Sequence, residues 1–240
     1  MSIKLQLFPL IFLALTSACT HQPAKLLEIR ALDQLPTLAA EFETTVIEPE
    51  THDGELKQHR HQWRFWRAAD RIETHNLEDN SGETWTKSAD GAVTYQQVFH
   101  DQKQVIEYVP GDLKAIGSEP DWSVVATLLS PAMIAPLLSD DSEDVLDRPA
   151  IHYQTKDPDN PLEITWLEHE QLPAMIKRKE HDRTVITRII AIYPLTQTPW
   201  PYLPSAEYRY TDFADIGDKE NDPIIKSILH KIKGGHSHGN

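Results

Sequence analysis

The only cysteine of the chain is Cys19, and it follows an apolar stretch close to the N-terminus. Lys4 gives the start a positive charge, and the small residues Ser17 and Ala18 come directly before the cysteine. This layout is typical of a secretory signal peptide, and the apolar stretch is too short to span a bilayer. Because a single cysteine cannot form a disulfide within the chain, the fold must be stable through its packed core alone.

The small residues before Cys19 also resemble the lipobox of bacterial lipoproteins, in which the cysteine is lipidated and becomes the mature N-terminus. We therefore expect a lipoprotein signal peptide at 1–18 and an acylated Cys19, while an ordinary signal peptide with an incidental cysteine is the alternative. Residue 20 is Thr20 and not the aspartate that retains enterobacterial lipoproteins in the inner membrane. The resemblance thus implies a palmitate-type anchor in the outer membrane of a Gram-negative bacterium, facing the periplasm.

The net charge of the chain argues against nucleic acid as a partner. The formal net charge is −14, with 37 acidic and 23 basic residues. Such a surface repels nucleic acid and anionic lipid. After removal of the signal, about 220 residues suit one folded domain. We expect a tether at 19–25, a domain at 26–215, and a C-terminal helix with a flexible histidine-containing tail at 216–240.

Turn signals divide most of this domain into short strands. Asp90-Gly91 predicts a tight hairpin, and His181-Asp182 predicts another. Helical spacing of apolar residues predicts a helix over 26–42 that Pro36 interrupts, and further helices over 120–138. The acidic run 140–147 is expected to be a solvated loop, with a calcium site as the lesser alternative. Asp222-Pro223 predicts the start of a last helix.

Two parts of the sequence resemble the LolA/LolB-like superfamily of periplasmic lipoprotein carriers and acceptors, which includes the sigma-factor regulator RseB. The first is the opening at 26–46, where a helix runs into a strand with a Phe-x-x-x-Val pattern at Phe42. The second comprises Trp63-Arg64-Phe65-Trp66-Arg67, Arg71-Ile72-Glu73 and the Ser88-Ala89-Asp90-Gly91 hairpin. The resemblance implies an α+β fold, a curved antiparallel β half-barrel covered by a few helices. It also implies an apolar concave face that accepts an acyl chain or a related ligand, with 120–138 as a lid.

Aromatic residues are the candidate ligand contacts. Most of them are spread over neighbouring predicted strands, where the core side and the ligand side of a half-barrel coincide. The candidates for a ligand cavity are Trp63, Phe65, Trp66, Trp85, Tyr95 and Phe99. The proline-rich loop at 194–204 carries the candidates for a docking loop, Trp200, Tyr202 and Leu203, and packing over the barrel mouth is the alternative.

Histidine is abundant and suggests a second kind of chemistry. Three imidazoles in a turn and strand, or two in a tail, are donors that zinc and copper accept. The candidates are His52, His59, His61, His236 and His238, and a solvated strand end or a disordered tail is the alternative. The sequence has no Gly-x-Ser-x-Gly elbow, no His-Glu-x-x-His motif and no phosphate-binding glycine loop, so we expect no enzyme, no catalytic residues and no cofactor.

These features together predict a non-catalytic, lipid-anchored periplasmic protein. We expect it to bind a lipid, a lipoprotein acyl chain or a protein partner on the concave face of the half-barrel. The alternatives are a structural or regulatory lipoprotein without a small ligand, and a periplasmic protein that binds zinc or copper.

Overall fold

Twelve strands form one open sheet in the computed structural model, which describes residues 25–49, 57–118 and 121–233. In sequence order the strands are β1 (Leu38–Ile47), β2 (Gln58–Arg67), β3 (Arg71–Asn76), β4 (Ser81–Lys87), β5 (Val93–Phe99), β6 (Gln104–Tyr108), β7 (Leu138–Val145), β8 (Arg148–Gln154), β9 (Leu162–Leu167), β10 (Leu172–Glu180), β11 (Arg183–Pro194) and β12 (Arg209–Asp212). The α-helices of these residues are α1 (Pro110–Ala115), α2 (Trp122–Thr127), α3 (Pro131–Ile134) and α4 (Pro223–Lys233). Short 3-10 turns are η1 (Leu32–Gln34), η2 (Leu195–Gln197), η3 (Phe213–Asp215) and η4 (Gly217–Lys219).

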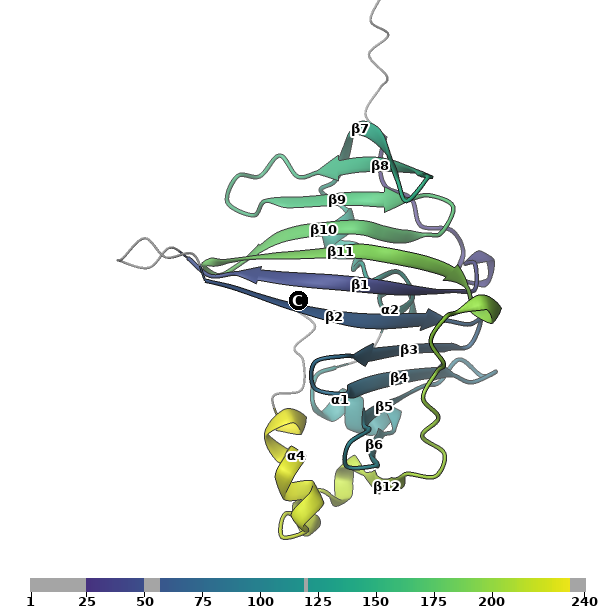
Figure 1. Ribbon diagram of the computed structural model, residues 1–240, viewed down its shortest axis with the longest axis vertical. Coiled ribbons are helices and arrows are strands. Elements are labelled where there is room, and N and C mark those ends of the chain that lie inside the picture. Colours follow the sequence, from purple (N-terminus) through teal and green to yellow (C-terminus); the bar gives the residue numbers. More distant parts are fainter. Residues whose placement is uncertain (1–24, 50–56, 119–120, 234–240) are drawn as a thin grey trace, which may run out of the picture.

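The strand order across the sheet is β12-β6-β5-β4-β3-β2-β1-β11-β10-β9-β8-β7. The long strands β1 and β11 pair in the middle, and the two end strands do not meet (Figure 1). Strand β12 runs parallel to β6, whereas the other pairs are antiparallel. The predicted fold class, an α+β curved half-barrel with a few helices, is confirmed.

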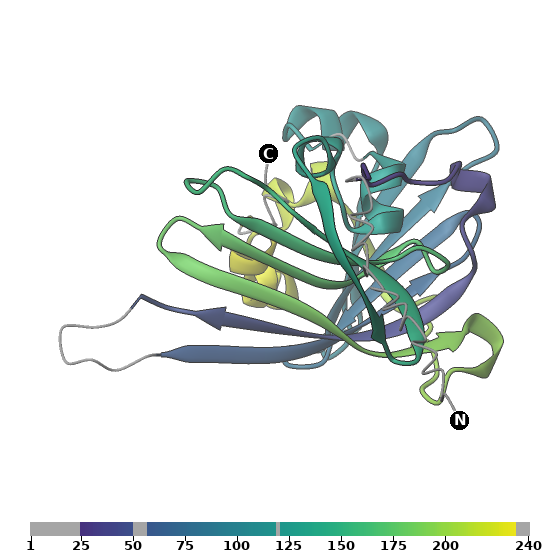
Figure 2. The ribbon, with the colours of Figure 1, turned by 90° about the horizontal axis from the view of Figure 1, so that it is seen from above.

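One face of the curved sheet is covered by the helices (Figure 2). Alternate residues of the strands point to this concave face and form one core cluster with helix residues. Phe42 of β1 stacks on Trp63 of β2 with ring centroids 4.4 Å apart, and Trp85 of β4 stacks on Tyr95 of β5 at 4.0 Å. The helical members of the cluster are Leu113, Trp122, Ala126, Ile225, Ile228 and Ile232.

A second apolar cluster lies at the β8–β10 end of the same face. Tyr153, Ile164 and Trp166 of the strands pack there against Leu27 and Leu129. The chain segment before β1 therefore contributes to the core without forming a helix. No helix of the described residues has the length and apolar character needed to cross a bilayer.

Both tight hairpins predicted from the turn signals are confirmed. Strands β4 and β5 pair on either side of Asp90-Gly91, and Gly91 has a φ of +88° that suits glycine. Strands β10 and β11 pair around His181-Asp182, where His181 has a φ of +58°.

The predicted helix over 26–42 is wrong. Residues 26–31 have no regular structure, η1 covers three residues, and β1 begins at Leu38. Leu27 and Ile29 instead reach the second apolar cluster from an extended chain. Pro36 disfavours helical backbone angles at Leu35, so a helix cannot continue past this residue. The segment that remains before Leu35 is too short to form a stable helix without strong caps.

The acidic run is a strand and not a loop. Residues Leu138–Val145 form β7, which pairs with β8 through a two-residue turn. Both turn residues, Leu146 and Asp147, have positive φ values, 53° and 58°. Leucine is rare in this conformation, so the sequence gives no turn signal at this point.

Helix α4 is an integral part of the core. Asp222 caps it by accepting hydrogen bonds from the backbone N–H groups of Ile224 and Ile225, at 2.9 and 3.2 Å, as the Asp-Pro pair predicted. Asp222 also pairs with Arg209 of β12 at 2.8 Å. The predicted boundary at 215/216 therefore falls between elements that share one core.

The guanidinium of Arg67 connects four parts of the chain at the end of β2. The side chain is 1 % exposed. Its nitrogens donate to the carbonyl oxygens of Pro36 at 3.0 Å, Ala126 at 2.8 Å and Gln171 at 3.0 Å, and to that of Glu170. Burial lowers the pKa of Arg67 to about 10, because the cation loses most of its contact with water. The loop before β1, helix α2 and the β9–β10 turn are thus held to β2 by one side chain.

We expect Arg67→Met to lower the free energy of unfolding by about 3 to 5 kcal/mol, because four buried carbonyl oxygens would lose their donor. Arg67→Lys should recover part of this loss, since an ammonium group reaches fewer of the four oxygens. Urea unfolding followed by tryptophan fluorescence measures both changes.

The matched control is Arg60→Met on the same strand. Arg60 is exposed and lies 3.4 Å from Glu43, so its loss should cost no more than about 1 kcal/mol. An Arg67→Met variant as stable as this control would contradict the role given to Arg67.

Candidate functional site

Five of the six candidate cavity aromatics lie together on the concave face. Trp63, Phe65, Trp85, Tyr95 and Phe99 all belong to, or pack against, the main core cluster. Their face is filled by side chains of α1, α2 and α4, so these rings contact the protein's own helices. Trp66 lies on the other face of β2, because consecutive residues of a strand point to opposite sides.

The predicted docking loop packs across the outer face of the sheet. In Figure 1 the chain from β11 to β12 runs in front of the strands, while α1 and α2 lie behind them. Trp200 makes an edge contact with Trp66 at 5.4 Å and lies under the guanidinium of Arg64 at 4.8 Å. The Tyr202 ring contacts Trp66 at 5.8 Å, and its hydroxyl accepts a hydrogen bond from Arg71 at 2.9 Å. Trp200, Tyr202 and Leu203 are therefore half-buried.

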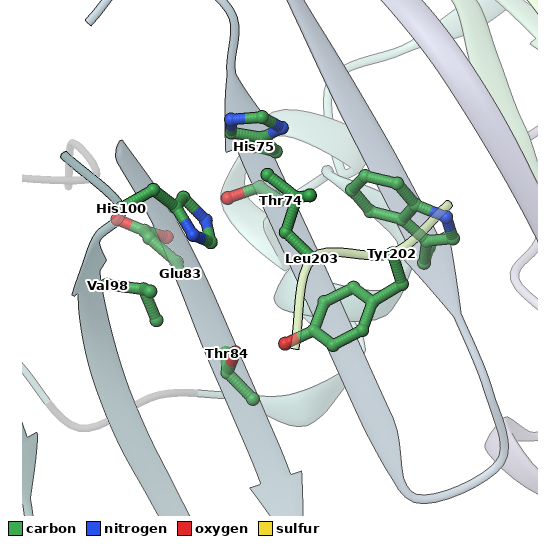
Figure 3. Close-up of a pocket in the computed structure, with 10 residues that line it drawn as sticks. Thr74, His75, Glu83, Thr84, Val98, His100, Tyr202 and Leu203 are labelled. Carbon is green, nitrogen blue, oxygen red and sulfur yellow. The ribbon is translucent and has the colours of Figure 1, made fainter. Parts of the chain in front are cut away.

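A small pocket lies beneath this loop (Figure 3). Its volume of about 10 Å³ has room for about one water molecule. His75 and His100 face each other there with ring centroids 4.9 Å apart, and His100 Nδ1 lies 3.0 Å from the hydroxyl of Tyr208. A Cβ on Gly82 would lie 2.5 Å from the Thr74 carbonyl oxygen, so glycine is required beside this pair. The pocket is too small for an organic ligand.

We expect His100 to make the stability of the fold depend on pH. Burial, and to a smaller degree the nearby His75, lowers the pKa of His100 to about 4, although Asp101 acts in the opposite direction. Because the unfolded chain binds this proton near the usual pKa of 6.5, the contribution is complete above about pH 6.5 and is lost as the pH falls towards 4. The group is half-buried, so we expect a loss of about 1 to 2 kcal/mol. Unfolding by urea at pH 7 and pH 4.5 measures it.

His100→Gln should reduce this difference between the two pH values, since glutamine does not titrate. His230→Gln, at an exposed position of α4, should leave the difference unchanged. If His100→Gln and wild type lose equal stability between pH 7 and 4.5, the histidine pair is not the source.

A second hollow is a groove beside strand β7. Thr165 of β9 and Met175 of β10 alternate with Ile164 and Ile176, so they point to the side opposite the second apolar cluster. The Oγ1 of Thr165 donates to Glu143 Oε1 of β7 at 3.1 Å, so this part of β7 lies beside Thr165. The groove has a volume of about 610 Å³ and is lined by Asp140, Asp141, Ser142, Glu143, Val145, His152, Thr165, Ala174, Met175, Arg188 and Ile189.

The groove combines an acidic wall with an apolar floor. Asp140, Asp141 and Glu143 come from β7, whereas Ala174, Met175 and Ile189 come from the middle of the sheet. Strand β7 has a strand neighbour on one side alone among the described residues, and Lys25 pairs with its first part through Ser139. Within residues 25–49, 57–118 and 121–233, no strand pairs with the edge of β7 beyond Ser139, and an unpaired edge can accept an extended segment.

Two of the five candidate metal ligands are brought together with a third group. His59 and His61 lie on one face of β2, and Glu78 comes from the turn after β3. His52, His236 and His238 lie outside the described residues, as does Cys19.

Sequence reasoning missed the groove and Glu78. The acidic residues of β7 show no apolar alternation, so the usual strand signal is missing there. Glu78 lies 19 positions from His59, and only the pairing of β2 with β3 brings them close.

Comparison with known proteins gives distant structural likenesses. No protein-family model and no curated protein sequence matches this chain. The crystal structure of MucB is similar over 74 % of this chain and 60 % of its own, with 12 % identity and a TM-score of 0.43. PNGF-II is similar over 76 % of this chain and 34 % of its own, with 9 % identity and a TM-score of 0.37. A LolA-superfamily protein of Nitrosomonas europaea is similar over 73 % of this chain and 90 % of its own, with 7 % identity and a TM-score of 0.34.

This chain thus spans less than two thirds of the MucB and PNGF-II structures. At these identities and TM-scores, what those proteins bind is not transferred to this chain. Membership of the LolA/LolB-like superfamily stays a prediction from the sequence.

Proposed function

We propose that this protein is a non-catalytic, lipid-anchored periplasmic protein that binds an extended basic segment of a protein partner. The observation that carries the proposal is the open groove of about 610 Å³ with an acidic wall on the end strand β7. Its volume is in the range of binding sites, roughly 300–1,000 Å³. An end strand can pair with a further strand through its backbone, and flanking pockets then select the side chains.

The charges of the groove favour a basic partner over a lipid. Asp140, Asp141 and Glu143 outnumber Arg188 among its charged lining residues. Lysine or arginine of an extended segment would meet these carboxylates, while its alternate apolar residues would meet Met175 and Ile189. The carboxylate of a fatty acid, or the phosphate of an anionic lipid, would be repelled by the same wall.

The concave face is a less suitable site for an acyl chain. Trp122 of α2 and Ile225 and Ile228 of α4 occupy the space in front of the aromatic strands. An acyl chain would need these helices to leave, and their apolar side chains would then be exposed to water. A lid movement of α2 alone would not uncover the part of the face under α4.

The groove can be tested with synthetic peptides of about ten residues in which lysine or arginine alternates with leucine or valine. We expect these peptides to bind the wild type, and peptides with glutamate in place of the basic residues not to bind. Asp140→Asn together with Asp141→Asn should weaken binding by about 3- to 10-fold, since each rim charge contributes about 0.2–1 kcal/mol. Fluorescence anisotropy at low salt measures the affinity.

The matched control is Asp218→Asn together with Glu220→Gln, which removes two exposed charges from the segment before α4. This control should bind the peptide as wild type does. Equal affinities of the groove variant and the control would reject the groove as the site. Binding of a fluorescent palmitate analogue without binding of peptide would favour the acyl-chain function instead.

The lipid anchor rests on Cys19 and has its own test. Cys19→Ser removes the thiol that acylation needs, so the mature chain should move from the membrane fraction to the soluble fraction. Mass spectrometry of the wild-type N-terminal peptide should show the added acyl mass on Cys19. Wild type and variant in the same fraction, with an unmodified Cys19, would show an ordinary signal peptide.

A further inference from the structure

Two histidines and one glutamate converge at the open end of the concave face. His59 and His61 point to the same side of β2 as the core residue Trp63, because they alternate along the strand. Their rings are stacked with centroids 5.9 Å apart. Glu78 approaches from the turn after β3, and its Oε2 lies 3.1 Å from His59 Nε2.

The spacing of the donor atoms is close to that of a metal-bound set. One ring nitrogen of each histidine and one oxygen of Glu78 all lie within 4.8 Å of one another. Ligand bonds of about 2.0–2.1 Å in a tetrahedron place the donors about 3.3 Å apart. The 3.1 Å between His59 Nε2 and Glu78 Oε2 is already close to this value, and no separation within the set exceeds it by more than about 1.5 Å. His59 and Glu78 are exposed and can rotate to meet His61.

The backbone that carries these residues is fixed. Leu77 N–H donates to the Gln62 carbonyl at 3.0 Å, which holds the start of the turn to β2. Asp79 accepts from Ser81 at 2.6 Å and from Lys231 of α4 at 2.9 Å. The ion pair between Asp79 and Lys231 therefore connects the turn that carries Glu78 to helix α4.

The electrostatic setting favours a cation. The formal net charge of the protein is −14, and Glu78 adjoins both histidines, whereas the charge of the neighbouring Asp79 is balanced by Lys231. The hydrogen bond with Glu78 involves the imidazole of His59 alone. It therefore does not account for the second imidazole, that of His61, on the same face of β2.

We propose that His59, His61 and Glu78 bind a divalent transition-metal ion, Zn²⁺ or Cu²⁺. Imidazole and carboxylate are donors that both ions accept. The three residues leave a fourth position open to water or to a side chain of a partner protein. This site lies apart from the β7 groove, because its residues are carried by β2 and by the β3–β4 turn, and it stands independently of the proposed function.

Calorimetry with Zn²⁺ on the full mature chain tests the site. We expect one ion per chain with micromolar or tighter affinity at pH 7.5, and weaker binding as the pH falls and protons compete for the imidazoles. His61→Gln and Glu78→Gln should each weaken binding by about 10- to 100-fold. The loss of a group that only orients a metal ligand already has an effect of this size, so the loss of a ligand should have at least the same effect. Visible absorption of the Co²⁺-loaded protein should report loss of the four-coordinate spectrum in both variants.

Two controls separate this site from others. Glu43→Gln removes a carboxylate from the opposite face of the neighbouring strand β1, where Glu43 is paired with Gln62, and should leave the affinity unchanged. His236→Gln together with His238→Gln removes the tail imidazoles and should also leave it unchanged. Binding that disappears with the tail pair and persists in Glu78→Gln would overturn the proposal, as would the absence of any binding at micromolar metal.

Discussion

The buried guanidinium of Arg67 is the contact on which the arrangement of the half-barrel depends. A sheet this wide has no closing strand pair, since β12 and β7 end it on opposite sides. Its curvature must be held by contacts that cross the concave face, and Arg67 makes them from one end of β2. Carbonyl oxygens rather than a carboxylate surround the cation, so each hydrogen bond also fixes a backbone position. The loop before β1, helix α2 and the β9–β10 turn are thereby joined to β2.

The two faces of the sheet use aromatic residues in different ways. On the concave face Phe42, Trp63 and Tyr95 form the core with the helices. On the outer face Trp66 and Trp200 attach the long connection between β11 and β12. The aromatic residues that the sequence suggested as ligand contacts thus pack mainly against other parts of the protein itself. The groove beside β7, with its acidic wall and apolar floor, is larger than the pocket beneath the 194–204 loop.

Much of the architecture could be predicted from local signals, because tight turns and alternation are local properties. Asp90-Gly91 and Asp222-Pro223 mark boundaries that depend on a few adjacent residues. The segment before β1 misled the prediction. Leu26 and Ile29 follow helical spacing but lie in a segment without regular structure, because Pro36 and tertiary contacts outweigh spacing. The acidic β7 and the site residue Glu78 could not be found this way. Their positions depend on the turn at Leu146 and on strand pairing across distant parts of the sequence.

The place of helix α4 in the core affects how the chain folds. The helix is the last element of the described residues, yet Ile225, Ile228 and Ile232 complete the core that begins with Leu38. Strands β1 to β11 therefore present an incompletely covered apolar face until α4 docks. Contacts between the two ends of a sequence form slowly, and an open apolar face in the meantime attracts chaperones or other chains. The core of the described residues is therefore complete only once α4 has docked on the strands.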